Sequence, residues 1–217
     1  MATRNDWFRR RTWTSEDRAD FESRLGRART AFHKSQSLRI QAFHLSEDAE
    51  PPLYEAALEL LDRLLRDFPD PSQLGEAHRQ RGKCLVAMQR PDEAVQAYQA
   101  ALAVERSHPS VQGHAYLDLS ELVLALNRDD LYAEVLEVVR ARQHHEIFPI
   151  AQYRAFGAAA FLSEHLGSPD DAREFATKAL SAAAQTESPF RYHRKLGLVD
   201  TSDEEVQRRL WHLARSV

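Results

Sequence analysis

Three consecutive side chains, His144, His145 and Glu146, are the most obvious candidate for a metal site in this sequence. Imidazole and carboxylate groups bind zinc, but a helical zinc site needs its ligands one turn apart, as in the HExxH pattern. Pro149 follows the triplet and interrupts any helix that would carry it. We therefore expect a solvated loop here and no metal site.

The only cysteine, Cys84, is the candidate for nucleophilic chemistry. His78 and Lys83 are close to it in sequence, but a catalytic thiol also needs a positioned histidine and a setting that lowers its pKa. Cys84 falls in a helical pattern, where a buried small side chain is the simpler interpretation. No GxGxxG, P-loop or GxSxG motif is present. We expect a protein that is not an enzyme and uses no cofactor, and a single thiol favours the reducing cytoplasm.

The stretch NDWFRRRTW at residues 5–13 combines aromatic rings with consecutive arginines: Trp7, Arg9, Arg10, Arg11 and Trp13. Such an arm can stack its rings on bases and contact phosphates. It can also be a strap that packs its rings on the first helices while the arginines face water, or an arm that grips a protein partner. Residues 1–45 carry ten basic and five acidic groups. The whole chain has a net charge of -4, so it has no general attraction to nucleic acid.

The elements that must position these groups are helices. Apolar residues recur at steps of three and four, as at Leu53, Ala57, Leu61 and Leu64. We expect helices near residues 15–25, 29–46, 52–67, 72–89, 91–106, 110–127, 129–143, 150–166, 169–184 and 202–215. No apolar run approaches the length of a membrane-spanning helix.

Residues that cap helices support the two outer elements. Thr14 is suited to cap the first helix and Gly26 to end it. Ser202 and Glu205 have the spacing of a capping box for the last helix. We expect both outer helices to cover the exposed ends of a repeat array.

The prolines repeat with a period of 40 residues. Pro69, Pro109, Pro149 and Pro189 are each 40 residues apart, and a second series that begins at Pro51 has the same first step. Because proline lacks an amide donor and fixes φ, it fits a first helical turn or an interhelical loop. Two interleaved series therefore indicate a repeated helical hairpin.

Residues 75–105, GEAHRQRGKCLVAMQRPDEAVQAYQAALAVE, resemble a tetratricopeptide repeat (TPR). Gly82 stands where that motif has a small residue on its first helix. Ala94, Tyr98 and Ala101 match the small, aromatic and small positions of the second helix. The small residues allow two helices to approach closely, and the aromatic ring fills the space beside them.

The resemblance covers about residues 35–185. It implies an all-α, right-handed α-solenoid of about four stacked helical hairpins, with N- and C-terminal capping segments. We divide the chain into a strap and capping helix (1–28), TPR-like repeats (29–189), and a C-terminal loop and capping helix (190–217). The usual period is about 34 residues, so a longer period leaves HEAT-like hairpins as an alternative.

Members of this family line a concave groove with their first helices, so the resemblance implies a groove for a peptide or protein segment. Alignment to the repeat gives these lining positions: Arg79, Lys83, His114, Glu121, Arg154, Phe161, Gln36 and Arg39. Arg79, Lys83 and Arg154 would attract an acidic segment of the partner. Some members clamp a C-terminal carboxylate with lysine, arginine and asparagine, but Asp118 stands near the position of that asparagine.

The sequence therefore predicts a cytoplasmic, non-enzymatic protein-interaction module or scaffold, and its arginine- and alanine-rich composition indicates a bacterial source. Two alternatives are open. The protein could be an antidote that neutralises a toxin or nuclease by occlusion, since the acidic region after residue 45 suits a basic enzyme. It could also bind nucleic acid through the N-terminal arm.

Overall fold

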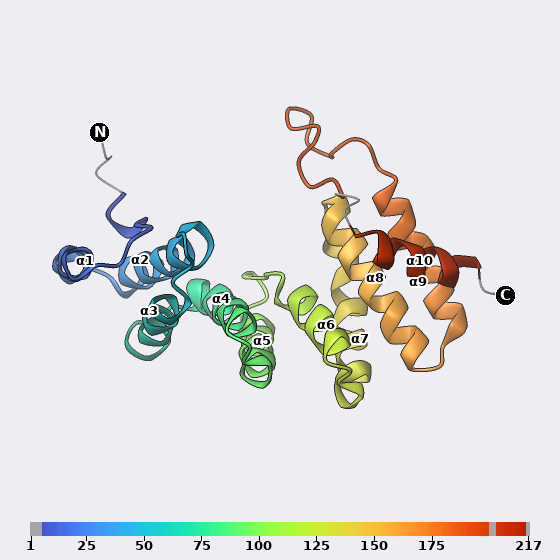
Figure 1. The fold of residues 1–217 in the computed structure, drawn as a ribbon, viewed down its shortest axis with the longest axis horizontal. Coiled ribbons are helices and arrows are strands. Elements are labelled where there is room, and N and C mark those ends of the chain that lie inside the picture. The colour runs from blue at the N-terminus through green and yellow to red at the C-terminus, as the bar shows by residue number, and fades with distance from the viewer. Residues whose placement is uncertain (1–5, 200–202, 216–217) are drawn as a thin grey trace. The chain divides into compact units, whose positions relative to one another are not determined.

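Helices are the regular secondary structure of the described residues, 6–199 and 203–215, in the computed structural model (Figure 1). The α-helices are α1 (Ser15–Arg27), α2 (Ala31–Phe43), α3 (Tyr54–Asp67), α4 (Pro71–Ala87), α5 (Pro91–Ser107), α6 (Ala115–Ala125), α7 (Asp129–Arg142), α8 (Pro149–His165), α9 (Pro169–Ala183) and α10 (Glu204–Arg215). Each overlaps a range expected from the apolar periodicity, and the predicted all-α fold is confirmed. Within the described ranges, no helix is long and apolar enough to cross a membrane.

Helix α1 begins where the sequence predicted but ends later than predicted. Thr14 caps the start, because its hydroxyl accepts the Asp17 N–H (3.2 Å) and the Asp17 carboxylate accepts the Thr14 N–H (3.0 Å). The predicted stop at Gly26 is wrong. α1 continues to Arg27, and Ala28 leaves the helix in an extended conformation that any residue can adopt.

The starts of α6 and α10 also differ from expectation. α6 begins at Ala115 rather than near residue 110, because the Gly113 N–H donates to the buried carboxylate of Glu105 (3.1 Å) instead of joining a helical turn. The predicted cap Ser202 lies outside the described residues. The carboxylate of Asp203 accepts a backbone N–H from the first turn of α10 (3.1 Å), which satisfies one of the amides that has no partner within the helix.

Proline marks the starts of four helices. α4, α5, α8 and α9 each carry proline in the first turn, where the backbone amide has no acceptor within the helix and its loss removes no hydrogen bond. Pro149 belongs to the 40-residue series that includes Pro69 and Pro109, which lie in loops, and Pro91 stands 40 residues after Pro51. The prolines therefore separate the helices of successive hairpins, as their spacing predicted.

The chain divides into two compact units, Met1–Ala115 and Tyr116–Val217, and each is described by itself. The division falls inside the range 29–189 that the repeat pattern treats as one array. The boundaries expected after residues 28 and 189, and the right-handed superhelix, stay predictions.

In the first unit, α2 packs on α3, α3 on α4, and α4 on α5. Gly82 of α4 faces the ring of Tyr98 of α5 so closely that a Cβ would overlap the ring. Ala94 and Ala101 of α5 are fully buried beside this contact. The small and aromatic positions of the repeat pattern therefore bring α4 and α5 into close contact, as the resemblance implied.

In the second unit, α7 packs on α8, α8 on α9, and α9 on α10. α8 and α9 meet through small side chains, among them the fully buried Ala155, Ala159, Ala176 and Ala179. Leu210 of α10 is also fully buried. A long connection that we call the 185–199 loop joins α9 to the chain leading into α10 (orange in Figure 1).

Candidate binding sites

Residues 6–13 form a strap that packs its aromatic rings inward. Phe21 of α1 is fully buried, and the rings of Trp7 and Trp13 lie 5.2 and 5.3 Å from its ring centre. Phe8 packs edge-on against Trp7 at 5.2 Å. The rings that a nucleic-acid arm would stack on bases are therefore in contact with other side chains of the first unit.

Arg10 attaches the strap to α2. Its N–H donates to the side-chain oxygen of Gln41 (3.1 Å), and the Gln41 amide donates back to the Arg10 carbonyl oxygen (2.8 Å). Its guanidinium donates to Asp17 (2.7 Å) and to Asp20. The expectation that all three consecutive arginines face water is wrong for Arg10, because two carboxylates of α1 lie within its reach. Arg9 and Arg11, on either side of it in the sequence, are exposed, as expected.

Asp17 joins the strap to the start of α1. Burial raises the pKa of Asp17, but hydrogen bonds from Thr14, Thr12 and Arg10 outweigh that effect and lower the pKa to about 2. The carboxylate therefore stays ionised well into the acidic range, and the strap keeps its electrostatic attachment there.

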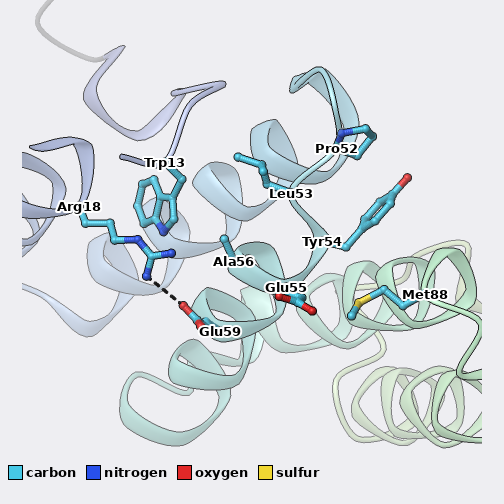
Figure 2. A pocket seen from close by; sticks show the side chains of 9 residues that line it. All are labelled: Trp13, Arg18, Pro52, Leu53, Tyr54, Glu55, Ala56, Glu59 and Met88. Carbon is cyan, nitrogen blue, oxygen red and sulfur yellow. Dashed lines mark hydrogen bonds and ion pairs between the residues drawn. The ribbon is translucent and has the colours of Figure 1, made fainter. Parts of the chain in front are cut away.

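A cavity of about 410 Å³ lies where the strap meets α3 and the end of α4 (Figure 2). It is lined by Trp13, Arg18, Pro52, Leu53, Tyr54, Glu55, Ala56, Glu59 and Met88. The guanidinium of Arg18 lies over the Trp13 ring (5.8 Å) and donates to Glu59 (3.3 Å). Arg18 therefore fills the place beside the Trp13 ring and the Glu59 carboxylate where a cation of a ligand could otherwise bind.

Two predicted groove cations of the first unit, Arg39 and Arg79, belong to a polar layer between α2 and α4. Arg39 Nε donates to Gln73 (2.7 Å), and Arg79 donates to Glu76 (3.3 Å). In the orientation that satisfies its amide, Gln80 donates to the Arg39 carbonyl oxygen (3.2 Å). Burial lowers the pKa of Arg39, and the charge of Glu76 partly opposes this effect. The bonds of Arg39 therefore join α2 to α4, while the bond of Arg79 to Glu76 lies within α4.

The other groove positions predicted in the first unit are spread more widely. Lys83 donates to Glu47 (2.6 Å) in the π-helical turn His44–Asp48. Gln36 is half-buried on α2, and His114 is exposed immediately before α6. The structure brings Arg39 and Arg79 into one layer, and a role of these residues in partner binding stays a prediction.

In the second unit, Arg154 of α8 is held by two carboxylates of α6. It donates to Glu121 through Nε (2.6 Å) and Nη2 (2.8 Å), and to Asp118 through Nη2 (2.8 Å). Burial lowers the pKa of Arg154, but these charge-assisted bonds outweigh it and raise the pKa above its ordinary value. Asp118, which the resemblance placed near the asparagine position of a carboxylate clamp, therefore binds an arginine of the same chain.

A cavity of about 340 Å³ lies beside this ion pair, and we call it the α8 cavity. It is lined by Glu121, Leu124, Tyr153, Arg154, Gly157, Ala158, Phe161, Asp203 and Val206. These residues come from α6, α8 and the start of α10. The guanidinium of Arg209 lies 4.3 Å from the centre of the Phe161 ring and donates to Glu164 (2.7 Å). The cavity therefore has apolar walls, a braced aromatic ring and a charged rim.

The structure brings three predicted groove residues of the second unit, Glu121, Arg154 and Phe161, to this cavity. Sequence reasoning missed its other walls. Tyr153 and Gly157 are neighbours of predicted positions on α8, and helical spacing could have found them. Val206 belongs to α10, which is far along the chain from α6 and α8, and no local sequence pattern predicts that it reaches the cavity.

The candidate nucleophile and the candidate metal ligands have no arrangement that would support catalysis or metal binding among the described residues. Cys84 is 1% exposed, and burial raises the pKa of its thiol to about 11. His144 and His145 are exposed in a single 3-10 turn, and Glu146 accepts a hydrogen bond from the Tyr116 hydroxyl. Among the residues that the structure describes, no three His, Cys, Asp or Glu side chains gather in a group that could hold a metal ion.

Comparison with known proteins shows similarity at the level of the fold. No protein-family model matches the chain, and no curated protein matches it in sequence. The chain is similar to a solved structure described as "Crystal structure of MamA protein", with 17% identity and a TM-score of 0.54. The match covers 85% of this chain and 86% of that one. At this identity the similarity shows a shared helical, TPR-like fold.

Proposed function

We propose that the protein is a non-enzymatic interaction module that holds a segment of a partner protein, with an apolar side chain of that segment in the α8 cavity. The observation that carries the proposal is the cavity itself. Small-molecule and peptide sites in proteins are concave, mostly apolar and edged by a few polar groups. A volume of about 340 Å³ suits one or two large side chains, and the walls are built mainly from helices α6 and α8.

The walls favour an apolar occupant. Leu124, Ala158, Phe161 and Val206 present hydrocarbon to the cavity, and Gly157 adds no side chain to fill it. Burial of a leucine or phenylalanine side chain there would contribute about 1.5–3 kcal/mol. An apolar anchor in a preformed pocket is the arrangement that dominates binding in many protein interfaces.

The rim favours a segment in a fixed orientation. Arg154 is already bound to Glu121 and Asp118 (2.6–2.8 Å), so its guanidinium does not have to be ordered on binding. Phe161 is likewise braced by Arg209. A site whose side chains are fixed beforehand loses less conformational entropy when a partner binds. The carboxylates at the rim then orient backbone amides or polar side chains of the segment.

The same features support a binding function rather than catalysis. The Glu121 carboxylate is neutralised by Arg154, and burial together with the nearby Asp203 raises the pKa of the Tyr153 hydroxyl, which keeps it protonated. The Tyr153 hydroxyl is therefore not activated as a base at neutral pH. The reduced, buried thiol of Cys84 supports the cytoplasm as the proposed location.

The test begins with a partner identified by affinity purification and quantitative mass spectrometry, followed by isothermal titration. Ala158→Phe places a ring inside the cavity, and Val206→Trp fills its mouth from α10. We expect both variants to bind the partner at least about tenfold more weakly than the wild type does. Ala133→Phe makes the same change at an exposed position of α7 and should bind as the wild type does. Unchanged affinity for variants that circular dichroism shows to be folded would exclude the α8 cavity.

A further inference from the structure

The 185–199 loop has a defined conformation of its own. The Ser188 N–H donates to the Arg194 carbonyl oxygen (2.9 Å), which closes the loop on itself. The Leu196 N–H donates to the His193 carbonyl oxygen (2.9 Å). Compact loops whose ends are close and whose interiors are bonded in this way often carry function.

The loop is also fixed to α8. The Ile150 N–H, in the first turn of α8, donates to the Gly197 carbonyl oxygen (2.8 Å). The ring of Phe190 stacks on Phe148 at 5.3 Å. Gly197 has φ +73°, and a Cβ there would overlap the Phe148 ring. Only glycine fits this position without strain, so the loop is held against the start of α8 in one conformation.

The loop turns large apolar groups toward solvent. Tyr192 is 86% exposed, Leu196 52% and Phe190 44%. Ile147, which precedes the stacked Phe148, is 61% exposed. Single exposed apolar residues are ordinary, but a group of them on one short segment marks an interaction surface. Tyrosine and arginine are also the residues most enriched at the energetic centres of protein interfaces.

The cations of the loop are available to a partner. Arg194 lies 3.8 Å from Glu187, while Arg191 and Lys195 make no ion pair with any residue that the structure describes. Several cations on the helices of the same unit are paired more tightly, as Lys178 is with Glu174 at 2.6 Å and Arg209 with Glu164 at 2.7 Å. The loop therefore offers three positive charges without losing an internal bond of comparable strength.

We propose that the 185–199 loop is the docking surface for acidic residues of the same partner segment whose apolar side chain fills the α8 cavity. This inference rests on the proposed function and names the chemistry of the partner. α8 connects the two sites, because Ile150 holds the loop and Tyr153, less than one turn later, lines the cavity. A segment with an apolar anchor flanked by Asp or Glu would contact both, with Tyr192 packing on its apolar part.

The surroundings favour a short acidic segment over an extended polyanion. Residues 116–217 carry 16 acidic and 12 basic groups, so nucleic acid or an anionic membrane would meet repulsion beyond the loop. Three cations also release few counterions from nucleic acid. Leu196 and Ile147 are aliphatic and cannot stack on bases as an aromatic ring does. A protein segment uses both the cations and the aliphatic groups.

The experiment is a selection of random linear peptides displayed on phage, with the full-length protein immobilised. Three proteins are compared: wild type, the cavity variant Ala158→Phe, and the loop variant Arg191→Ser/Arg194→Ser/Lys195→Ser. On wild type we expect enriched peptides to combine an apolar residue with flanking Asp or Glu. The loop variant should still enrich apolar residues but lose the acidic ones. For peptides synthesised from the wild-type pool, we expect the loop variant to bind about tenfold more weakly.

A matched control removes the same charge elsewhere. Arg27→Ser/Arg106→Ser/Arg208→Ser changes three exposed arginines and should enrich the same acidic peptides as wild type. If wild type enriches no acidic residues, or the loop variant enriches them equally, the loop inference is overturned while the cavity proposal stands. If Ala158→Phe selects the same apolar peptides as wild type, the proposed function fails instead.

The same proteins are then titrated with oligo-dT and with vesicles of phosphatidylglycerol and phosphatidylcholine. We expect no binding that depends on the loop cations in either case. Tighter binding of oligo-dT or of the anionic vesicles than of the acidic peptides, lost in the loop variant, would overturn the inference in favour of those ligands.

Discussion

The strap at residues 6–13 and the 185–199 loop have similar compositions and opposite arrangements. Both combine aromatic rings with several cations in a short stretch outside the α-helices. In the strap, Trp7 and Trp13 pack on buried Phe21. In the loop, Tyr192 is 86% exposed. Local composition therefore does not decide whether such a segment is structural or interactive. The acceptors and apolar faces that the rest of the fold provides decide it.

The difference has an identifiable physical origin. α1 offers the strap an apolar ring to pack on and two carboxylates, Asp17 and Asp20, for Arg10. The start of α8 offers the loop one ring, that of Phe148, and one backbone amide. Phe190 stacks on the Phe148 ring, so Tyr192 and the cations of the loop stay at the surface.

The largest effect should come from removing the ring on which the strap packs. Phe21→Ala removes the ring on which both indoles pack and leaves a cavity at a fully buried position, and we expect a loss of about 3–5 kcal/mol in the free energy of unfolding. The matched change in the loop, Phe190→Ala, should cost about 1 kcal/mol or less, because the ring is 44% exposed. Urea unfolding followed by circular dichroism measures both. Similar losses for the two variants would show that the loop depends on its ring as much as the strap does.

The next effect concerns the attachment of the loop. Gly197→Ala introduces a Cβ that overlaps Phe148 at a positive φ, and we expect it to destabilise the attachment by about 1–3 kcal/mol. Hydrogen exchange of the Ile150 amide reports this directly and should accelerate. Gly26→Ala is the control, because nothing lies within 4 Å of a Cβ in that helical position. It should stabilise the protein by about 0.5–1 kcal/mol. Unchanged exchange at Ile150 would mean that Gly197 does not fix the loop.

Acid should loosen the strap at residues 6–13. The pKa of Asp17 is about 2 in the folded protein and about 4 in an unfolded chain. Its carboxylate therefore stabilises the strap above pH about 4, and this contribution is lost as the pH falls from about 4 to about 2. In a Trp211→Phe background, fluorescence reports only Trp7 and Trp13. We expect a red shift across this window that is absent in Asp17→Asn, where the strap is already loosened.

The smallest effect should be that of the most exposed ring. Tyr192→Ala removes a side chain that is 86% exposed, and the free energy of unfolding should change by less than about 0.5 kcal/mol. Peptides from the wild-type selection should nevertheless bind this variant more weakly. A destabilisation above about 1 kcal/mol would show that Tyr192 supports the fold, and the loop would then resemble the strap.

Much of the fold could be predicted because it depends on local signals. Prolines, apolar periodicity and the Gly82 and Tyr98 positions of the repeat pattern act within one or two helices. The end of α1 could not be read in the same way, since Gly26 continues the helix and Ala28 ends it.

The candidate sites were less predictable because their partners lie far along the chain. Arg154 follows from the repeat register, but its bonds to Asp118 and Glu121 join residues 33 or more positions apart. The 185–199 loop has no helical or strand period, and its composition, FRYHRK beside a proline and a glycine, was its only signal. The strap showed the same kind of signal, and only the position of Phe21 and Asp17 separates the two.

The reciprocal hydrogen bonds between Gln41 and Arg10 have a consequence for how this protein can vary. Gln41 contacts the main chain of residue 10, so these two hydrogen bonds do not depend on the side chain at that position, whereas the bonds to Asp17 and Asp20 do. Among substitutions at residue 10, proline should stand apart, because it has no N–H to donate. At position 41 the tolerance should be narrow, because the fully buried side chain must both donate and accept. For these two hydrogen bonds, position 10 should therefore tolerate most substitutions and position 41 few, although both belong to the same contact.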